Sequence, residues 1–122
     1  EKMGTVKYFE EFKIWQDARE LVGEIYAFTG GVRDYGFNDQ IQRAAVSVMN
    51  NIAEGAEAGS VSMFKRFLLI AKGSCGEVRS MLYIASDLNY MEKLKVEKLQ
   101  EKCKMLSVGI YNLLNYLDRK QD

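Results

Sequence analysis

The sequence of 122 residues contains neither histidine nor proline. Without histidine, the chain lacks the Glu-x-x-His pairs of di-iron bundles, the usual zinc motifs and every histidine-based nucleophilic triad. Carboxylates remain as possible acid–base groups. However, Glu54 and Glu77 are the acids nearest to apolar positions, and a buried glutamate is more often the partner of an arginine. We therefore predict no catalytic residue, no metal ligand and no cofactor.

Long apolar runs are also missing. No run approaches the ~20 residues that a membrane span needs, and the first residues, EKMGTVKYFEEF, lack the apolar centre of a secretion signal. Cysteine is scarce, and Cys75 and Cys103 stand inside apolar helical patterns, which predicts buried, reduced thiols. We expect a cytoplasmic protein without a membrane partner, folded as one domain over residues 1–122.

Turn residues gather at a few places and divide the chain into four segments with a helical period. We expect Asn38 to cap the second helix and Ser60 the third, because their side-chain oxygens can accept from free N–H groups in the first turn. Gly55 and Gly59 are expected to end the second helix. The helices are predicted at about 9–29, 39–55, 61–88 and 93–119.

Apolar residues in each segment recur at alternating spacings of four and three, which places them on one side of a helix. The predicted interior positions are Ile14, Ala18, Leu21, Ile25 and Phe28; Ile41, Ala45, Val48 and Ile52; Phe64, Leu68, Ala71, Cys75, Val78, Leu82 and Ala85; and Val96, Leu99, Cys103, Leu106, Ile110, Leu113 and Leu117. Short connections make consecutive helices neighbours. The fold class is therefore all-α, an up-down-up-down antiparallel four-helix bundle.

Two glycines, Gly73 and Gly76, lie in the middle of the third helix. Each interior glycine costs about 0.5–1 kcal/mol relative to alanine, so something should approach the backbone closely there. We favour a tight helix crossing inside the bundle, next to Ala71. Approach by a ligand or by a partner's backbone is the alternative.

A row of polar residues borders the apolar positions of the second helix: Arg43, Ser47, Asn50, Asn51 and Glu54. Such a row can be a hydrogen-bonded seam within the fold, or the face by which subunits recognise each other. A small-molecule site is the less favoured alternative.

Two aromatic residues, Trp15 and Tyr83, are further interface candidates, because large aromatic side chains are enriched at interface anchors. For either residue, a place in the core or partial exposure to solvent is the ordinary alternative.

Charge is balanced overall but uneven along the chain. The formal net charge is zero, with 17 basic and 17 acidic residues, yet residues 1–57 carry a net −4 and residues 58–122 a net +4. Lys65, Lys72 and Arg79 recur every seven residues on the third helix, and Lys98 and Lys102 lie on the fourth. These rows are either solvated faces or weak electrostatic sites for RNA or DNA.

Five stretches together resemble a known family: FKIWQDARELV, QIQRAAVSV, NIAEG, FKRFLLIAKGSCGEVRSML and IASDLNYM. The resemblance, over nearly the whole chain, is to four-helix bundle proteins encoded in intervening sequences of 23S ribosomal RNA genes. That family is similar to the accessory proteins of diversity-generating retroelements. The resemblance implies homopentameric rings, no catalysis and, in the retroelement branch, binding of nucleic acid and a reverse transcriptase. Met49 stands where members usually carry proline, which puts a kink of the second helix in doubt.

The functional hypothesis is a non-enzymatic, self-assembling four-helix bundle, a homopentamer, that serves as a nucleic-acid or ribonucleoprotein accessory factor. The alternative is a small-molecule-binding or protein-scaffold bundle without a nucleic-acid role.

Overall fold

The computed structural model describes residues 8–120, and this part of the chain contains helices and no strand. Its elements are the 3-10 turn η2 (Phe9–Glu11) and the helices α1 (Lys13–Thr29), α2 (Tyr35–Glu57), α3 (Val61–Asp87) and α4 (Lys93–Asp118). The first helix begins later than the expected residue 9, because Phe12 has an extended backbone (φ −77°, ψ 127°) between η2 and α1.

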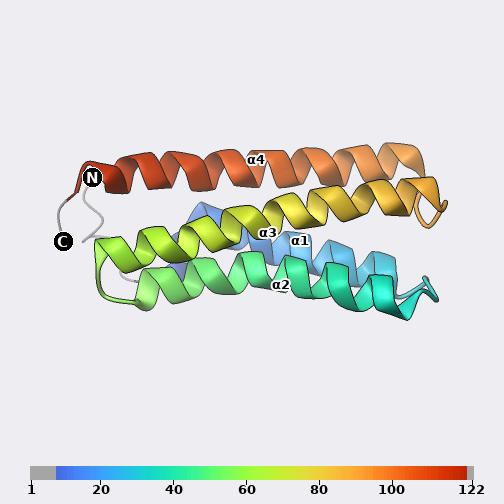
Figure 1. Cartoon of the computed structure of the whole chain (residues 1–122), viewed down its shortest axis with the longest axis horizontal. Helices are drawn as coiled ribbons and strands as arrows, with labels where there is room; N and C mark the ends of the chain where they lie inside the picture. Colours follow the sequence, from blue (N-terminus) through green and yellow to red (C-terminus); the bar gives the residue numbers. More distant parts are fainter. Residues whose placement is uncertain (1–7, 121–122) are drawn as a thin grey trace.

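Consecutive helices run antiparallel. The α1/α2 and α3/α4 connections lie at one end of the molecule, and the α2/α3 connection lies at the other (Figure 1). The predicted all-α, up-down-up-down bundle is therefore confirmed. It consists of two hairpins, α1/α2 and α3/α4, joined mainly through the packing of α2 on α3.

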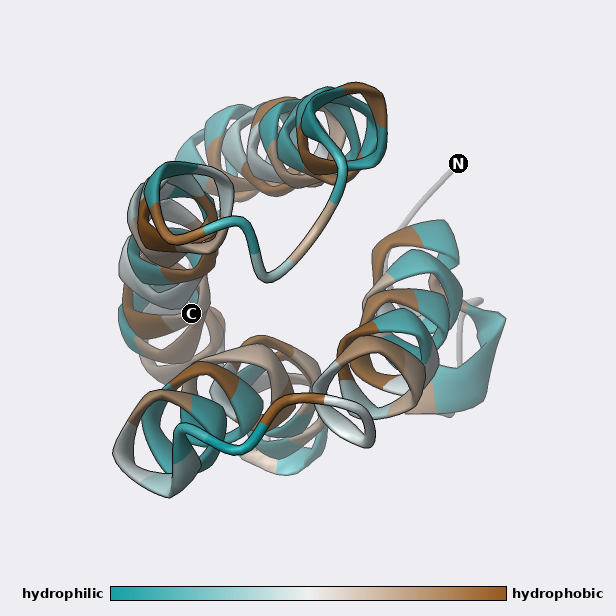
Figure 2. Cartoon of the chain, turned by 90° about the vertical axis from the view of Figure 1, so that its right-hand side faces the viewer, coloured by the Kyte–Doolittle hydropathy of each residue, from teal (hydrophilic) through white to brown (hydrophobic). Residues whose placement is uncertain are grey.

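The core lies between the helices, whose apolar sides face the middle when the molecule is viewed along its length (Figure 2). Almost all predicted interior positions are buried, and Phe28 and Leu113 are partly buried; Leu114 takes the buried place beside Leu113. Because full burial of a leucine or isoleucine contributes about 1.5–3 kcal/mol, this core supplies the main stabilisation of the fold.

The start of α2 differs from the sequence prediction. Asp34, not Asn38, is the N-cap, and its carboxylate accepts from Phe37 N at 3.1 Å. The buried Asn38 side chain instead donates to the carbonyl oxygens of Thr29 and Val32, at 3.3 and 2.7 Å. Asn38 therefore holds the α1/α2 connection against the bundle, and the predicted cap was wrong because a second capping residue stands one turn earlier.

The α2/α3 connection confirms Ser60 as an N-cap, since its hydroxyl accepts from Met63 N at 3.2 Å. Gly55 does not end α2, which continues to Glu57. A Cβ at Gly55 would lie 2.9 Å from both Phe64 Cδ1 and Phe67 Cβ, so glycine is needed there for the close contact of α2 with α3. Gly59 lies in the loop with φ +91°, where glycine is favoured.

The glycines of α3 do not form the tight crossing expected inside the bundle. Gly73 and Gly76 are exposed, and a Cβ built on either would meet no atom within 4 Å in the described structure. The expectation was wrong because the two residues lie on the opposite side of the helix from the buried Ala71. Met49 lies within an α2 that runs as one helix, and it packs against the core.

Candidate functional site

The polar row of α2 separates into two groups. Ser47 and Asn51 lie at the contact with α3, where Ser47 Oγ is 2.8 Å from Ser74 Oγ and Asn51 Nδ2 donates to Ser47 Oγ at 3.0 Å. These bonds form a polar seam within the fold.

The other three residues of that row point to the outside. Arg43, Asn50 and Glu54 are exposed, and Arg43 pairs with Asp39 of its own helix at 2.9 Å. The row therefore borders the contact with α3: Ser47 and Asn51 lie at its inner edge, and the other three residues lie beside them on the exposed side of α2.

The two aromatic candidates also differ. Trp15 is half-buried, meets Phe9 edge to face at 5.1 Å between ring centroids, and carries the Arg19 guanidinium over its ring. Tyr83 is 60% exposed on α3. Trp15 thus contributes to packing inside this chain, whereas the ring of Tyr83 is available to another molecule.

The outward side of α3 is an apolar surface, which we call the α3 face. It consists of Leu69, Ile70, Gly73, Gly76, Ser80, Tyr83 and Ile84, all exposed. The exposed fractions of Leu69 and Ile70 are 59% and 51%. Our sequence interpretation missed Leu69, Ile70 and Ile84, although plotting α3 as a helical wheel would have placed them opposite the core.

A groove of about 390 Å³ separates α3 from α4, and we call it the basic groove. Its charged lining residues are Lys72, Arg79 and Lys104, and no described acidic side chain lines it. Lys72 and Arg79 belong to the predicted basic row, and Lys104 was missed. Lys65, the third member of that row, is paired with Asp118 instead.

Cys75 and Cys103 also line this groove. Both are buried and free, which confirms the prediction of buried, reduced thiols. Burial raises the pKa of both thiols to about 12. Because the thiolate is the reactive form, both sulfurs are chemically inert near neutral pH.

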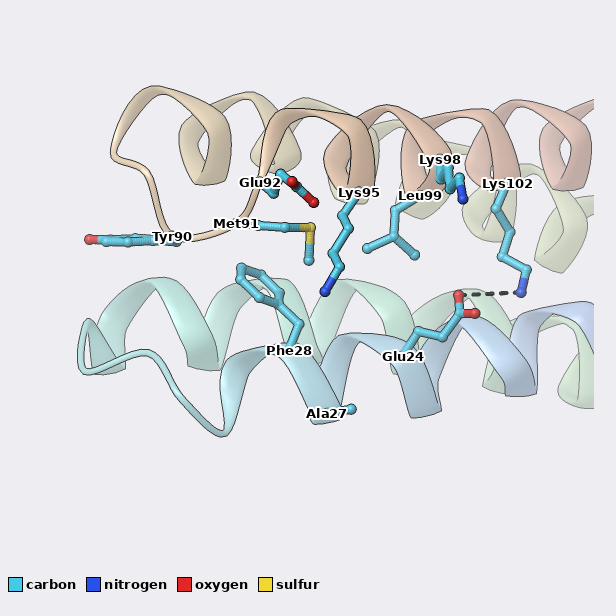
Figure 3. A pocket seen from close by; sticks show the side chains of 10 residues that line it. All are labelled: Glu24, Ala27, Phe28, Tyr90, Met91, Glu92, Lys95, Lys98, Leu99 and Lys102. Carbon is cyan, nitrogen blue, oxygen red and sulfur yellow. Dashed lines mark hydrogen bonds and ion pairs between the residues drawn. The ribbon is translucent and has the colours of Figure 1, made fainter.

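A second hollow, which we call the α1/α4 cleft, has a volume of about 760 Å³. Lys98 and Lys102, predicted to support a nucleic-acid site, both line this cleft (Figure 3). Lys102 Nζ donates to Glu20 Oε1 and Glu24 Oε1, at 3.1 and 3.2 Å. Partial burial lowers the pKa of Lys102, but these bonds outweigh it and the pKa is raised. The predicted basic residues therefore lie on two separate surfaces.

Residues 8–120 contain neither a group of side chains suited to a metal ion nor a helix suited to a membrane. Histidine, cysteine, aspartate and glutamate do not gather anywhere in this range in groups of three or more suited to a metal ion. None of the helices in the described part is both long and apolar enough to span a bilayer.

The fold and these surfaces define a small helical bundle with its distinctive features on the outside of the α3/α4 hairpin and in the α1/α4 cleft. The model of the 23S rRNA-intervening sequence protein family matches residues 10–112, and the chain belongs to this family.

A similar solved structure is that of a protein with unknown function from the S23 ribosomal protein family of Bacteroides thetaiotaomicron VPI-5482. The two share 19% identity with a TM-score of 0.76 over 84% of this chain and 95% of that chain, a likeness of fold. No curated protein matches the chain. Neither description names a catalytic activity.

Proposed function

We propose that this chain is a non-enzymatic bundle that assembles with copies of itself through the α3 face into a closed homopentamer, the form that the family resemblance implies. The observation that carries the proposal is the exposure of Leu69, Ile70, Tyr83 and Ile84 on one side of one helix. Contiguous apolar surface of this kind marks contact sites in soluble proteins.

The small residues of the α3 face support a helix as its partner. At Gly73 and Gly76 the backbone is uncovered, so a neighbouring helix can approach without meeting a side chain. The cost of two interior glycines, which the bundle itself does not explain, then has a cause in the assembly.

A closed ring needs two different contact surfaces on each copy. Helix α4 offers the second, because Leu94 and Met105 are 66% and 62% exposed outside the basic groove. We infer that the α3 face of one copy packs on the exposed side of α4 of the next.

The test is the mass in solution. We expect the parent protein to show five times its 14.0 kDa chain mass by light scattering at all concentrations. The double variant Leu69→Glu with Ile84→Glu should be monomeric and keep its helical circular dichroism, because both side chains are outside the core. Tyr26→Glu, an exposed aromatic position on α1, is the matched control and should leave the oligomer intact.

A parent protein that remains monomeric at every concentration would end the assembly proposal. A different but constant subunit number would end the pentamer alone.

We further propose that the assembled protein binds RNA or DNA in the cytoplasm through the basic groove. The supporting observation is that Lys72, Arg79 and Lys104 line it without an acidic side chain among the described lining residues. Net charge is zero, so attraction has to come from local basic sites repeated by symmetry.

Salt titration with labelled oligonucleotides tests this second role. If five grooves each engage one phosphate, log K should fall against log salt with a slope of roughly −4 to −5 on duplex and less on single strands. Exchanging Lys72, Arg79 and Lys104 for glutamate should abolish binding and leave the oligomer mass unchanged. Binding that is absent at low salt, or independent of salt, would remove the nucleic-acid role and leave the assembly proposal standing.

A further inference from the structure

The α1/α4 cleft is crossed near each end by a contact between its two sides. At one end Tyr90 Oη donates to Asp34 Oδ2 at 2.7 Å, joining the α3/α4 and α1/α2 connections. At the other end Lys102 bridges from α4 to Glu20 and Glu24 of α1. At ~1.5 Å per helical residue, the cleft between Glu92 and Lys102 is roughly 15 Å long. The space between the two contacts is one short hollow.

Apolar side chains line part of the cleft, beside charged residues at its rim. Phe28 rises from α1 toward Met91, and Leu99 projects from α4 into the same space (Figure 3). Ala27 beside Phe28 is small and leaves the α1 side open. Apolar walls with a few polar groups are typical of small-molecule sites, whose volumes are about 300–1,000 Å³. The 760 Å³ of this cleft falls within that range.

The lysines at the rim differ in their partners. Lys102 is held by two carboxylates, whereas Lys95 and Lys98 form no ion pair with any residue in the described range 8–120. The Lys95 side chain extends from α4 across the cleft toward Phe28 (Figure 3). Glu24 and Glu92 also line the cleft, so its charged lining consists of three lysines and two carboxylates. Lysines without an ion-pair partner beside apolar side chains are complementary to an anion that carries an apolar body.

We propose that the α1/α4 cleft binds a small amphipathic anion: an acyl or aromatic body with one carboxylate or phosphate head. The body packs against Phe28, Met91 and Leu99, and the head lies between Lys95 and Lys98. The short length of the hollow favours a small molecule over a segment of another protein, because a bound helix would have to continue past Tyr90 or past Lys102.

Two fluorescent probes of similar shape test the proposal: anionic anilinonaphthalene sulfonate and neutral phenylnaphthylamine. We expect the parent protein to bind the anion at least about tenfold more tightly, because only the anion gains charge-assisted contacts with lysine. The double variant Lys95→Gln with Lys98→Gln should remove this preference and leave the weaker neutral binding. Lys93→Gln with Arg33→Gln, which removes the same charge outside the cleft, is the matched control and should keep it.

Two further arms locate the site and choose the head group. Ala27→Trp should abolish binding of both probes by filling the cleft, whereas Ala58→Trp in the exposed α2/α3 connection should not. Displacement by decanoate and by decyl phosphate, with decanol as the neutral comparison, distinguishes a carboxylate from a phosphate ligand. Equal binding of both probes, equal displacement by decanol, or full binding to the lysine variant would overturn the proposal.

Anion binding in the α1/α4 cleft should not depend on assembly through the α3 face. The variant Leu69→Glu with Ile84→Glu alters the α3 face and should keep the cleft and its anion preference. If that variant loses the preference, the anion sits on the assembly surface and the cleft proposal fails.

Discussion

The two hairpins share one kind of interior and have different exteriors. In α1/α2 the exposed large apolar side chains of the described helices are Tyr26 and Tyr35 alone. In α3/α4 they are Leu69, Ile70, Tyr83, Ile84, Leu94, Met105, Val108 and Tyr111. All four helices contribute buried residues to the core, so the core does not account for this difference. The contrast supports the proposal that copies of the chain meet through α3/α4.

The charges follow the same division. Residues 1–57 contain six basic and ten acidic groups, and residues 58–122 contain eleven and seven. Within one chain, Lys102 of the more basic half forms ion pairs with Glu20 and Glu24 of the more acidic half. This attraction between the two hairpins weakens as the salt concentration rises, because both partners are at the surface.

The largest expected effect is the difference in stability cost between truncating two adjacent residues of α3, one in the core and one on the α3 face. Leu68 is fully buried and Leu69 is 59% exposed. Leu68→Ala should lower the free energy of unfolding by about 2–5 kcal/mol, because it leaves a cavity. Leu69→Ala should change the stability of the monomer by less than about 0.5 kcal/mol.

Chemical denaturation measures both variants, with the double variant Leu69→Glu and Ile84→Glu as the monomeric background for Leu68→Ala. Equal costs at the two positions would show that the outside of α3 supports the fold and is no free surface.

A smaller effect is expected from replacing two glycines by alanine. The free energy of unfolding should change in opposite directions at Gly55, which is inside the bundle, and at Gly76, on the open side of α3. Gly55→Ala should destabilise by about 1–3 kcal/mol, because Phe64 and Phe67 leave no space for the added carbon. Gly76→Ala should stabilise the monomer by about 0.5–1 kcal/mol and weaken self-association.

Thermal unfolding and light scattering on the same samples measure the two effects. If Gly76→Ala changes neither stability nor association, the α3 face is not approached closely by another helix.

The smallest effect concerns the bond that ties the two hairpins together at one end. The Tyr90 hydroxyl, and then Phe37 N, donate to Asp34 and hold the pKa of its carboxyl below the ordinary value. A carboxyl with a lowered pKa in the folded state stabilises the fold above its unfolded pKa. That contribution is lost as pH falls through the folded pKa, so stability should begin to decline below about pH 4.

Tyr90→Phe should raise the pKa of Asp34 toward its ordinary value and reduce the loss of stability at low pH. An NMR titration of the Asp34 carboxyl follows both proteins, with Tyr35→Phe as the control for removing an exposed hydroxyl nearby. An unchanged Asp34 pKa in Tyr90→Phe would show that the two connections are not joined.

Much of the fold follows from the spacing of apolar residues, because burial decides which side of each helix faces inward. The spacing does not show which neighbouring helix lies beside a residue that borders the apolar side. Lys72 and Lys98 were placed in one predicted site, yet α4 has α3 on one side and α1 on the other, so the two lysines line different hollows.

Local rules were weakest where two residues could play one role. Asp34 and Asn38 are both good helix caps, and only the tertiary contacts of Asn38 with Thr29 and Val32 decide between them. The glycines of α3 signalled a close approach, but spacing alone did not reveal that Gly73 and Gly76 face away from the core.

The buried thiols have a practical consequence for labelling chemistry. With a pKa of about 12, Cys75 and Cys103 are almost entirely protonated at neutral pH. The thiol then outnumbers the thiolate by roughly five orders of magnitude. Maleimide reagents should therefore leave both native cysteines unmodified and react with a single cysteine introduced at Ala58, which is exposed in the α2/α3 connection. Spin labels or fluorophores attached there can report the spacing between copies without replacing either native sulfur.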